Sequence, residues 1–392
     1  MRGHIVKRYK NSYSIVLNLG VDPATGRRKQ QWISVKGTKK DAEKKLAELL
    51  HQLDNGTFVK PGKLLFGDYL DRWLRDYCEC NLAPNTAETY RWFIDCHIKP
   101  ALGRIPLTQL KPEHLQRLYS DKLTAGRLDG AGGLGNRSVR YIHTTVHRAL
   151  KSAVKLGMIS RNPADAVDIP KVVRREIRAM DETDIHIFLE YARSTPYYPL
   201  FYLAFFSGMR RSELLALRWS DIDLLLCQAS VNRTLHQLHN REIIFSQPKT
   251  TKSRRLIALS PSTVAVLRKH QEAQHKLRQA LGIPFSDNDL VFCKPDGSPL
   301  LPDSVTQAWR NLAKRAGLSG FRLHDARHSH ASVMLKQGVH PKIVQERLGH
   351  ASIQITLDTY SHLMPGLQEL AARGFDEMVL PRRENEAIEK DG

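Results

Sequence analysis

Polar side chains whose chemistry suits a phosphodiester are scattered through the second half of this 392-residue chain. Arginine offers a planar fork of donors that matches two phosphate oxygens, and it keeps its charge near neutral pH. Lysine and histidine can move protons, and tyrosine can act as a nucleophile. The candidates are Arg210, Lys249, His324, Arg327, His350 and Tyr360. Together they would suffice to cut and rejoin DNA without a metal ion or ATP.

The first arginine stands in the sequence SGMRRSEL, after an apolar helical stretch over 200–206. Gly208 interrupts that stretch, and Glu213 belongs to the next helical pattern. The spacing therefore predicts that Arg210 lies at a junction between two helices, where backbone donors are also available to a phosphate. Arg211 is the neighbouring alternative. Taken alone, either arginine could simply be a surface residue.

The lysine stands in QPKTTKSRR, between the strand-like segments 242–246 and 255–260. This placement predicts that Lys249 lies at the tip of a β-hairpin, from which it could reach into a minor groove. A lysine near a phosphate and two arginines can have a lowered pKa and can donate a proton to a departing 5′ oxygen. Lys252 is the neighbour that could be mistaken for it.

The remaining candidates follow in two closely spaced groups. His324 and Arg327 are three residues apart, so on a helix they share one face and can address the same phosphate. Gly349 holds a C-cap position at the end of a helical pattern, which exposes His350 at the turn. Tyr360 follows ten residues later, downstream of every group that a tyrosine nucleophile would need.

Two further histidines raise the alternative of a metal site. His328 and His330 lie close to His324 in the sequence HDARHSH. However, His324 and His330 would point to different faces of a helix, and no cluster of carboxylates completes a metal site. We therefore interpret His328 and His330 as structural or supporting groups, and we expect no metal or other cofactor.

The composition indicates a polyanionic partner inside the cell. Lys and Arg number 60 against 40 Asp and Glu, which gives a formal net charge of +20. Contacts to phosphates release condensed counterions, so such an excess favours nucleic acid. The five cysteines follow no disulfide or zinc pattern and are expected to be reduced thiols. No signal-peptide pattern or membrane-spanning run is seen, so we expect no membrane partner and a cytoplasmic protein.

Residues 1–60 are predicted to form a small domain of three strands and one helix. The strand-like segments are 4–9, 12–19 and 27–35, with turn residues at 22–26 between the last two. Thr38 and Asp41 form a capping-box pattern at the start of the helix. This domain has thirteen basic and five acidic residues. The resulting positive charge would allow the open face of the sheet to bind in a DNA groove. A charged, solvated sheet face is the alternative.

A linker at 60–63 leads to a region over 64–168 whose pattern is entirely helical. We predict that its second helix runs over 85–98 and stops before Pro100. The last helix, over 137–156, carries a basic set that could follow a phosphate backbone, although each member alone is more typical of a solvated face. That set is Arg140, His143, His147, Arg148, Lys151 and Lys155.

A basic linker at 169–178 precedes a third domain over 178–380, which is mostly helical with short strand-like segments. The predicted fold class is therefore a multidomain protein, mainly α with small β-sheets. The residues after Tyr360 have the pattern of a short amphipathic helix, which we expect to pack on a neighbouring protomer.

The successive segments SGMRRSELLALRW, QPKTTKSRR, LHDARHSHAS and LGHASIQITLDTYSHL resemble, in order, the catalytic boxes of the tyrosine recombinases. The resemblance is to the phage and transposon integrase branch, and it extends over nearly the whole chain. LAPNTAETY is similar to the core-site-binding domain of that branch, and residues 1–55 are similar to its arm-site-binding domain. The serine in SGMR, where many relatives carry threonine, has no obvious chemical consequence.

The resemblance implies roles for the candidates. Tyr360 would attack the scissile phosphate and form a 3′-phosphotyrosyl link, while Arg210 and Arg327 hold the non-bridging oxygens. Lys249 would protonate the leaving 5′ oxygen, and His324 would assist proton transfer at the tyrosine.

The same resemblance implies that His350 hydrogen-bonds the phosphate. It also implies a homotetramer on double-stranded DNA with core and arm sites, passing through a Holliday junction. The chain would integrate or excise a prophage or conjugative transposon, with a possible excisionase and host DNA-bending protein as partners. It would be associated with the bacterial nucleoid when it acts.

Two other classes of protein remain as alternatives. A type IB topoisomerase uses similar chemistry, but it has little use for a second, distant DNA site. A non-catalytic DNA-binding protein would not need Tyr360 or both arginines.

Overall fold

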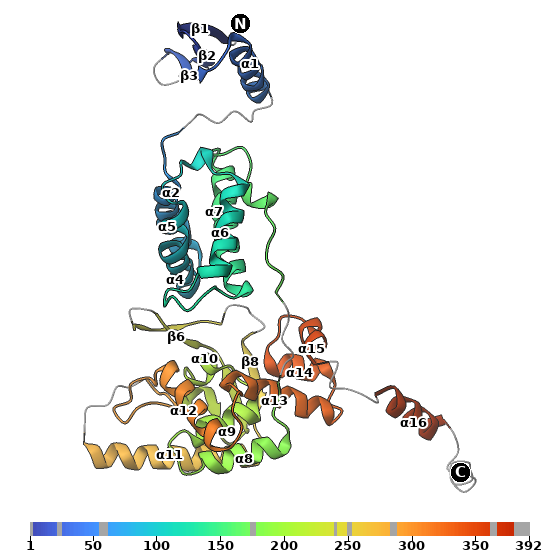
Figure 1. Ribbon diagram of the computed structural model, residues 1–392. Helices are drawn as coiled ribbons and strands as arrows, with labels where there is room; N and C mark the ends of the chain where they lie inside the picture. Colours follow the sequence, from blue (N-terminus) through green and yellow to red (C-terminus); the bar gives the residue numbers. More distant parts are fainter. Residues whose placement is uncertain are drawn as a thin grey trace. The chain divides into compact units, whose positions relative to one another are not determined.

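The computed structural model describes residues 3–21, 26–54, 62–172, 178–238, 241–248, 253–282, 288–360 and 367–379. The chain divides into two compact units, 1–174 and 175–392 (Figure 1). The expected fold class, mainly α with small β-sheets, is confirmed. No helix within these described ranges is long and apolar enough to cross a membrane.

The first unit begins with a three-stranded antiparallel sheet in the order β1-β2-β3 and one helix. The elements are β1 (Gly3–Tyr9), β2 (Ser12–Val21), β3 (Arg28–Lys36) and α1 (Lys39–Asp54). Thr38 caps α1 as predicted, because its Oγ1 accepts from the backbone N–H of Asp41 at 3.3 Å, and its own backbone N–H donates to Asp41 Oδ2 at 2.8 Å. Ile15 and Leu17 of β2 pack with Leu49 of α1 to form the core of this small domain. Most of the predicted turn at 22–26 lies outside the described residues.

The same unit continues as a helical bundle with a hydrophobic core of its own. Its main helices are α2 (Phe66–Trp73), α4 (Pro84–Phe93), α6 (Pro112–Ala125) and α7 (Asn136–Lys155). The prediction that the second helix stops before Pro100 is wrong. A π-helical turn, Ile94–Ile98, carries α4 on into α5 (Lys99–Leu102). Pro100 lies in the first turn of α5, directly after the π-helical turn.

Two members of the basic set predicted on α7 contact other helices of the bundle instead of facing solvent. His143 is buried, and its Nδ1 is 3.0 Å from the hydroxyl of Tyr119. Arg148 donates to the hydroxyls of Tyr77 and Tyr90, both at 3.3 Å. The idea that His143 follows a phosphate backbone is therefore wrong. The members that stay exposed are Arg140, Lys151 and Lys155.

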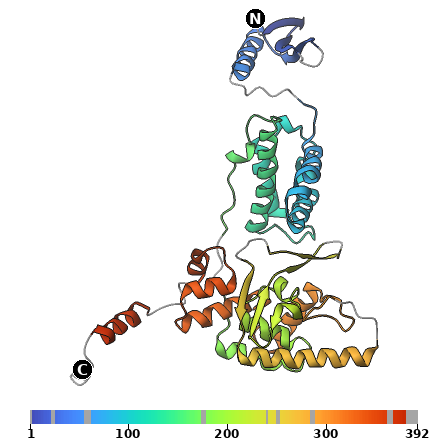
Figure 2. The same ribbon diagram turned by 180° about the vertical axis from the view of Figure 1, so that it is seen from behind.

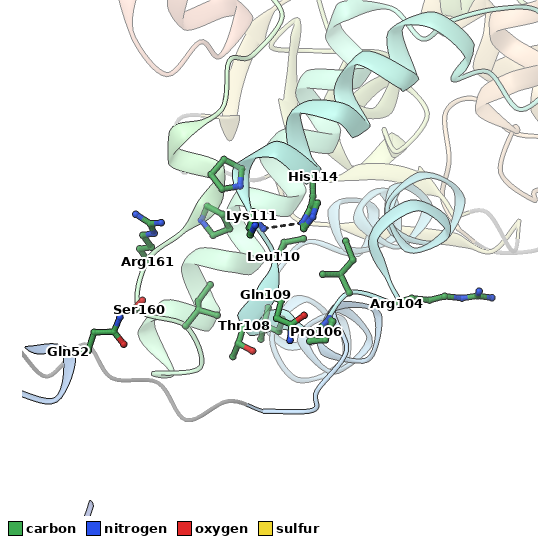
Figure 3. A pocket seen from close by; sticks show the side chains of 15 residues that line it. Gln52, Arg104, Pro106, Thr108, Gln109, Leu110, Lys111, His114, Ser160 and Arg161 are labelled. Carbon is green, nitrogen blue, oxygen red and sulfur yellow. Dashed lines mark hydrogen bonds between the residues drawn. The ribbon is translucent and has the colours of Figure 1, made fainter. Parts of the chain in front are cut away.

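A basic concavity also lies on the bundle, around the start of α6 (Figure 3). Arg104, Lys111 and Arg161 line it and are exposed. The backbone N–H of Lys111 donates to Nδ1 of His114 at 3.2 Å, which fixes the first turn of α6. The exposed positive charge of the bundle is thus spread over its turns as well as over α7.

The second unit packs helices around two small antiparallel sheets, and Figure 2 shows the long helix α11 along one side of it. Phe188, Phe201 and Trp309 lie in its core, with the rings of Phe188 and Trp309 4.1 Å apart. The helices are α8 (Glu182–Ala192), α9 (Tyr198–Ser207), α10 (Arg211–Leu214), α11 (Pro261–Leu281), α12 (Pro302–Arg315), α13 (Leu323–Lys336), α14 (Pro341–Leu348), α15 (Ile353–Tyr360) and α16 (Leu367–Val379).

The strands of this unit pair differently from the prediction. They are β4 (Ile222–Asp223), β5 (Gln228–Val231), β6 (Thr234–Gln237), β7 (Ile243–Ser246) and β8 (Arg255–Ala258). β7 and β8 do not form a hairpin with each other, because β7 pairs with β6 and β8 pairs with β5. In this pairing Ile257 of β8 lies opposite Ala229 of β5, and both residues are buried.

Candidate active site

The turn that follows α14 connects the two predicted arginines. Gly349 ends this helix in the left-handed conformation, with a φ of 66°. The carbonyl oxygen of Leu348 accepts a hydrogen bond from Arg327 Nη2 at 2.6 Å. The next carbonyl, of Gly349, accepts one from Arg210 Nη2 at 3.3 Å. Two guanidinium groups that are far apart in sequence are thus held at one turn, directly before His350.

Arg210 occupies the predicted junction between two helices. Gly208 ends α9 with a φ of 65°, and Arg210 is the N-cap residue of α10. Its Nη1 donates to Glu213 Oε1 at 2.7 Å, and its backbone N–H donates to Glu213 Oε2 at 2.8 Å. Arg211 points elsewhere, since its Nη1 donates to Thr306 Oγ1 at 2.6 Å. Arg210 is therefore the member of this pair that lies beside Arg327.

Arg327 is the more deeply buried of the two arginines, with a relative exposure of 3%. Besides its bond to Leu348, it donates from Nη1 to the carbonyl of Gly208 at 2.9 Å. Desolvation, and then the charge of Arg210, lowers the pKa of Arg327 to about 9. The group stays protonated at neutral pH. Of the five N–H donors on a guanidinium, these two contacts use only two.

Glu213 links Arg210 to a third arginine. Arg255 of β8 donates from Nη2 to Glu213 Oε2 at 2.9 Å, and both side chains are almost fully buried. Although desolvation pushes the pKa of Glu213 upward, the hydrogen bonds and charges of Arg255 and Arg210 hold it below its ordinary value. Two arginines thus share one carboxylate, and Arg327 lies beside Arg210 without contacting it.

An excess of positive charge in a desolvated site favours an anionic ligand. Arg255 was not among the predicted site residues. The signal available for it was its position in the strand-like segment after QPKTTKSR.

The predicted histidines lie at the same site and are uncharged. His350 Nδ1 is 2.9 Å from Thr356 Oγ1, and desolvation, followed by Arg327 and Arg210, lowers its pKa to about 3. His324 keeps one side open to solvent, yet the surrounding protein and the charge of Arg327 lower its pKa as well. Neutral imidazoles can donate one hydrogen bond and accept another.

Tyr360 is the last residue of α15 and is 1% exposed. Its hydroxyl lies 2.7 Å from Nδ1 of His328. Burial raises the pKa of Tyr360 to about 12, while the charge of Arg327 pulls it the other way. α13, α14 and α15 lie side by side, which brings the tyrosine to the arginines (Figure 1).

His328 therefore contacts the nucleophile candidate directly, although it was predicted to be a structural or supporting group. Its spacing of four residues from His324, on one face of α13, was the signal that could have found it. The two imidazole rings are 5.0 Å apart and perpendicular. His330 has a separate role, because its Nε2 accepts a hydrogen bond from Arg347 Nε at 2.9 Å.

Lys249 and its neighbour Lys252 lie outside the described residues. They belong to the connection between β7 and β8, two strands of different sheets. Elsewhere, over the parts of the chain that the structure describes, no group of three or more His, Cys, Asp or Glu residues could hold a metal ion.

Comparison with known proteins identifies the class to which this fold and site belong. Residues 177–366 match the phage integrase family, and residues 65–123 match the N-terminal SAM-like domain of phage integrases. The ICEBs1 integrase of Bacillus subtilis (strain 168) is 28% identical, over 95% of this chain and 100% of its own length.

Solved structures with the same fold are also integrases. The Tn1549 transposon integrase in complex with transposon right end DNA has a TM-score of 0.65 at 19% identity, covering 81% of this chain and 100% of its own. A lambda integrase dimer bound to a COC′ core site has a TM-score of 0.56 at 19% identity, covering 92% and 94%.

The two family matches together span more than half of the chain. The chain therefore belongs to the phage integrase family, which consists of tyrosine-type site-specific recombinases.

Proposed function

We propose that this chain integrates and excises a mobile element by cutting and rejoining double-stranded DNA through a 3′-phosphotyrosyl link at Tyr360. One observation carries the proposal. Arg210, Arg327 and His350 meet at a single turn, and Tyr360 lies on the neighbouring helix within the electrostatic reach of Arg327. The site holds more guanidinium groups than carboxylates, which suits a phosphodiester.

Each predicted residue has one role in the cleavage step. The Tyr360 oxygen attacks the scissile phosphorus, and the 5′ oxygen leaves. Arg210 and Arg327 donate to the non-bridging oxygens, where negative charge accumulates in the transition state. Lys249 protonates the 5′ oxygen, and His350 hydrogen-bonds the phosphate.

In this scheme a histidine of α13 supports proton transfer on the tyrosine side, the role that the family resemblance gives to His324. The phosphotyrosyl link conserves the energy of the phosphodiester, so no cofactor is required. Attack by the 5′ hydroxyl of another strand reverses the reaction and exchanges the strands.

Because Tyr360 and Arg327 belong to one chain and lie together, we expect each protomer to cleave with its own tyrosine. Four protomers would exchange two pairs of strands through a Holliday junction. The exposed apolar side chains on α16, Phe375 and Met378, support a contact with a neighbouring protomer. If a chain lacking residues 366–392 still assembled and recombined, this expected contact would be refuted.

The basic N-terminal sheet domain, residues 1–60, is proposed to bind arm sites, and the helical bundle, residues 64–168, to bind core sites. We further propose that the chain acts in the bacterial cytoplasm, on the nucleoid. An excisionase and a host DNA-bending protein would set the direction of the reaction.

A nicked suicide substrate tests the proposal. Its sequence is obtained by sequencing the joined ends of the DNA segment that carries the gene. The wild-type chain should form a covalent adduct, and Tyr360→Phe should form none while still shifting the DNA in a gel.

Arg210→Ala should slow adduct formation by roughly 100- to 1,000-fold, as expected for loss of one transition-state donor. Arg211→Ala is the matched control and should stay within a few-fold of the wild type. No adduct with the wild-type chain, or an adduct with Tyr360→Phe, would sink the proposed function.

A further inference from the structure

The hydroxyl of Tyr360 and Nδ1 of His328 form a buried contact in the site, 2.7 Å long. Tyr360 is almost fully buried at the end of α15, and His328 is half-buried on α13. The family resemblance assigned proton transfer at the tyrosine to His324. In the structure His324 instead packs the edge of its ring against His328, 5.0 Å between ring centres. His328 thus contacts the hydroxyl, and His324 contacts His328.

The surroundings of His328 keep its imidazole neutral. Desolvation is the main cause that lowers its pKa to about 4, and the neighbouring His324 adds to it. A neutral imidazole with a proton on Nε2 has a free lone pair on Nδ1. In this tautomer Nδ1 can accept the tyrosine O–H at the observed distance of 2.7 Å, which is the geometry required of a general base.

We propose that His328, and not His324, accepts the proton of Tyr360 as the tyrosine attacks DNA. The inference rests on the proposed function of Tyr360 as the nucleophile. In the step, the Tyr360 O–H bond breaks and an N–H bond forms at His328 Nδ1. The Tyr360 oxygen bonds to phosphorus, the bond from phosphorus to the 5′ oxygen breaks, and that oxygen takes a separate proton from Lys249. In the rejoining step His328 returns its proton to the departing tyrosine oxygen.

Two substitutions at one position separate proton acceptance from positioning. His328→Asn places an amide oxygen near the location of Nδ1, so it can still accept a hydrogen bond from Tyr360 but has no basic nitrogen. His328→Ala removes both properties. The rate of adduct formation is measured in single turnovers with the full-length chain in excess over nicked substrate, so that differences in DNA affinity do not enter.

We expect both variants to lose roughly 100- to 10,000-fold in the rate, the usual contribution of a positioned general base. An Asn variant that cleaves at the wild-type rate would show that only the hydrogen bond matters, and it would overturn the inference. His328→Asn is also the variant closest in shape to the wild type, so it serves as the test if His328→Ala does not fold.

A second substrate shows which side of the reaction is affected. Replacing the bridging 5′ oxygen with sulfur supplies a leaving group that needs no proton. This substrate should restore cleavage by Lys249→Ala and leave the His328 variants slow. Restored cleavage in the His328 variants would place His328 on the leaving-group side and overturn the inference. Failure of the wild-type chain to form any adduct would instead remove the proposed function itself, so the two failures are distinguishable.

Discussion

The buried carboxylate of Glu213 provides the sharpest test of how this site is built. Its side chain is 1% exposed and lies between Arg210 and Arg255, whose own side chain is 6% exposed. Glu213→Gln keeps the shape and removes the charge, so Arg255 is left buried without its carboxylate partner. Breaking a buried ion pair from one side costs about 3–5 kcal/mol.

That cost can be converted into a melting temperature. For a domain of this size, 1 kcal/mol shifts Tm by roughly 2–4 °C, so the expected shift is about 6–20 °C. The measurement is calorimetry of the full-length chain, following the transition of the second unit. Glu190→Gln is the matched control, since its ion pair with Arg193 has the same spacing but is exposed. Exposed pairs contribute about 0–1 kcal/mol, so the control should shift Tm by no more than a few degrees.

The same substitution should also slow adduct formation, because Glu213 holds the guanidinium of Arg210 at 2.7 Å. In the double variant Glu213→Gln, Arg255→Met the unpaired buried cation is gone, so we expect much of the lost stability to return. A Tm shift below 2 °C for Glu213→Gln, together with wild-type cleavage, would refute the reasoning. No recovery in the double variant would show that the cost lies in packing.

Two further predictions concern Gly208, at the end of α9, and His330, on α13. Gly208→Ala should destabilise the second unit by about 1–3 kcal/mol, because the φ of Gly208 is +65° and an added Cβ would lie 2.7 Å from His330 Cδ2. The control is Gly317→Ala, where φ is +74° but the space around the added Cβ is open. This control should cost about 1 kcal/mol in the same thermal melts. Desolvation, and then Arg347, lowers the pKa of His330 to about 3, so its neutral form stabilises the fold above pH 6.5 and this contribution is lost as the pH falls. The free energy of unfolding should therefore fall by about 2 kcal/mol between pH 7 and pH 5 because of His330. His330→Gln keeps an acceptor for Arg347 but does not titrate, so its free energy of unfolding should fall by about 2 kcal/mol less. Urea titrations at the two pH values measure both proteins. Equal drops in the two proteins would contradict this assignment.

Helix starts that depend only on neighbouring residues could be predicted from the sequence. The capping pair Thr38 and Asp41 does what its spacing predicts, because a cap involves only neighbouring backbone groups. The prediction that the second helix of the bundle ends before Pro100 was wrong, because the helix continues to Leu102. A π-helical turn lies directly upstream of α5, and sequence spacing does not reveal such a turn.

Longer-range pairing could not be predicted in this way. The strand-like segments around Lys249 suggested a hairpin, but β7 and β8 belong to different sheets. Strand partners depend on which side chains can be buried together, and Ile257 is buried opposite Ala229 of β5. The position of Lys249 itself stays a prediction.

For the site, the sequence by itself determined which groups we propose to react, because the types and order of residues state what chemistry is possible. Choosing between Arg210 and Arg211 from the sequence agrees with the contacts of both side chains. Only the tertiary structure decided which histidine contacts Tyr360. Packing of α13 against α15 selects His328 from three nearby histidines, and sequence spacing carries no information on how two helices meet. The third arginine, Arg255, became visible for the same reason, since its role arises from a buried carboxylate 42 residues away in the chain.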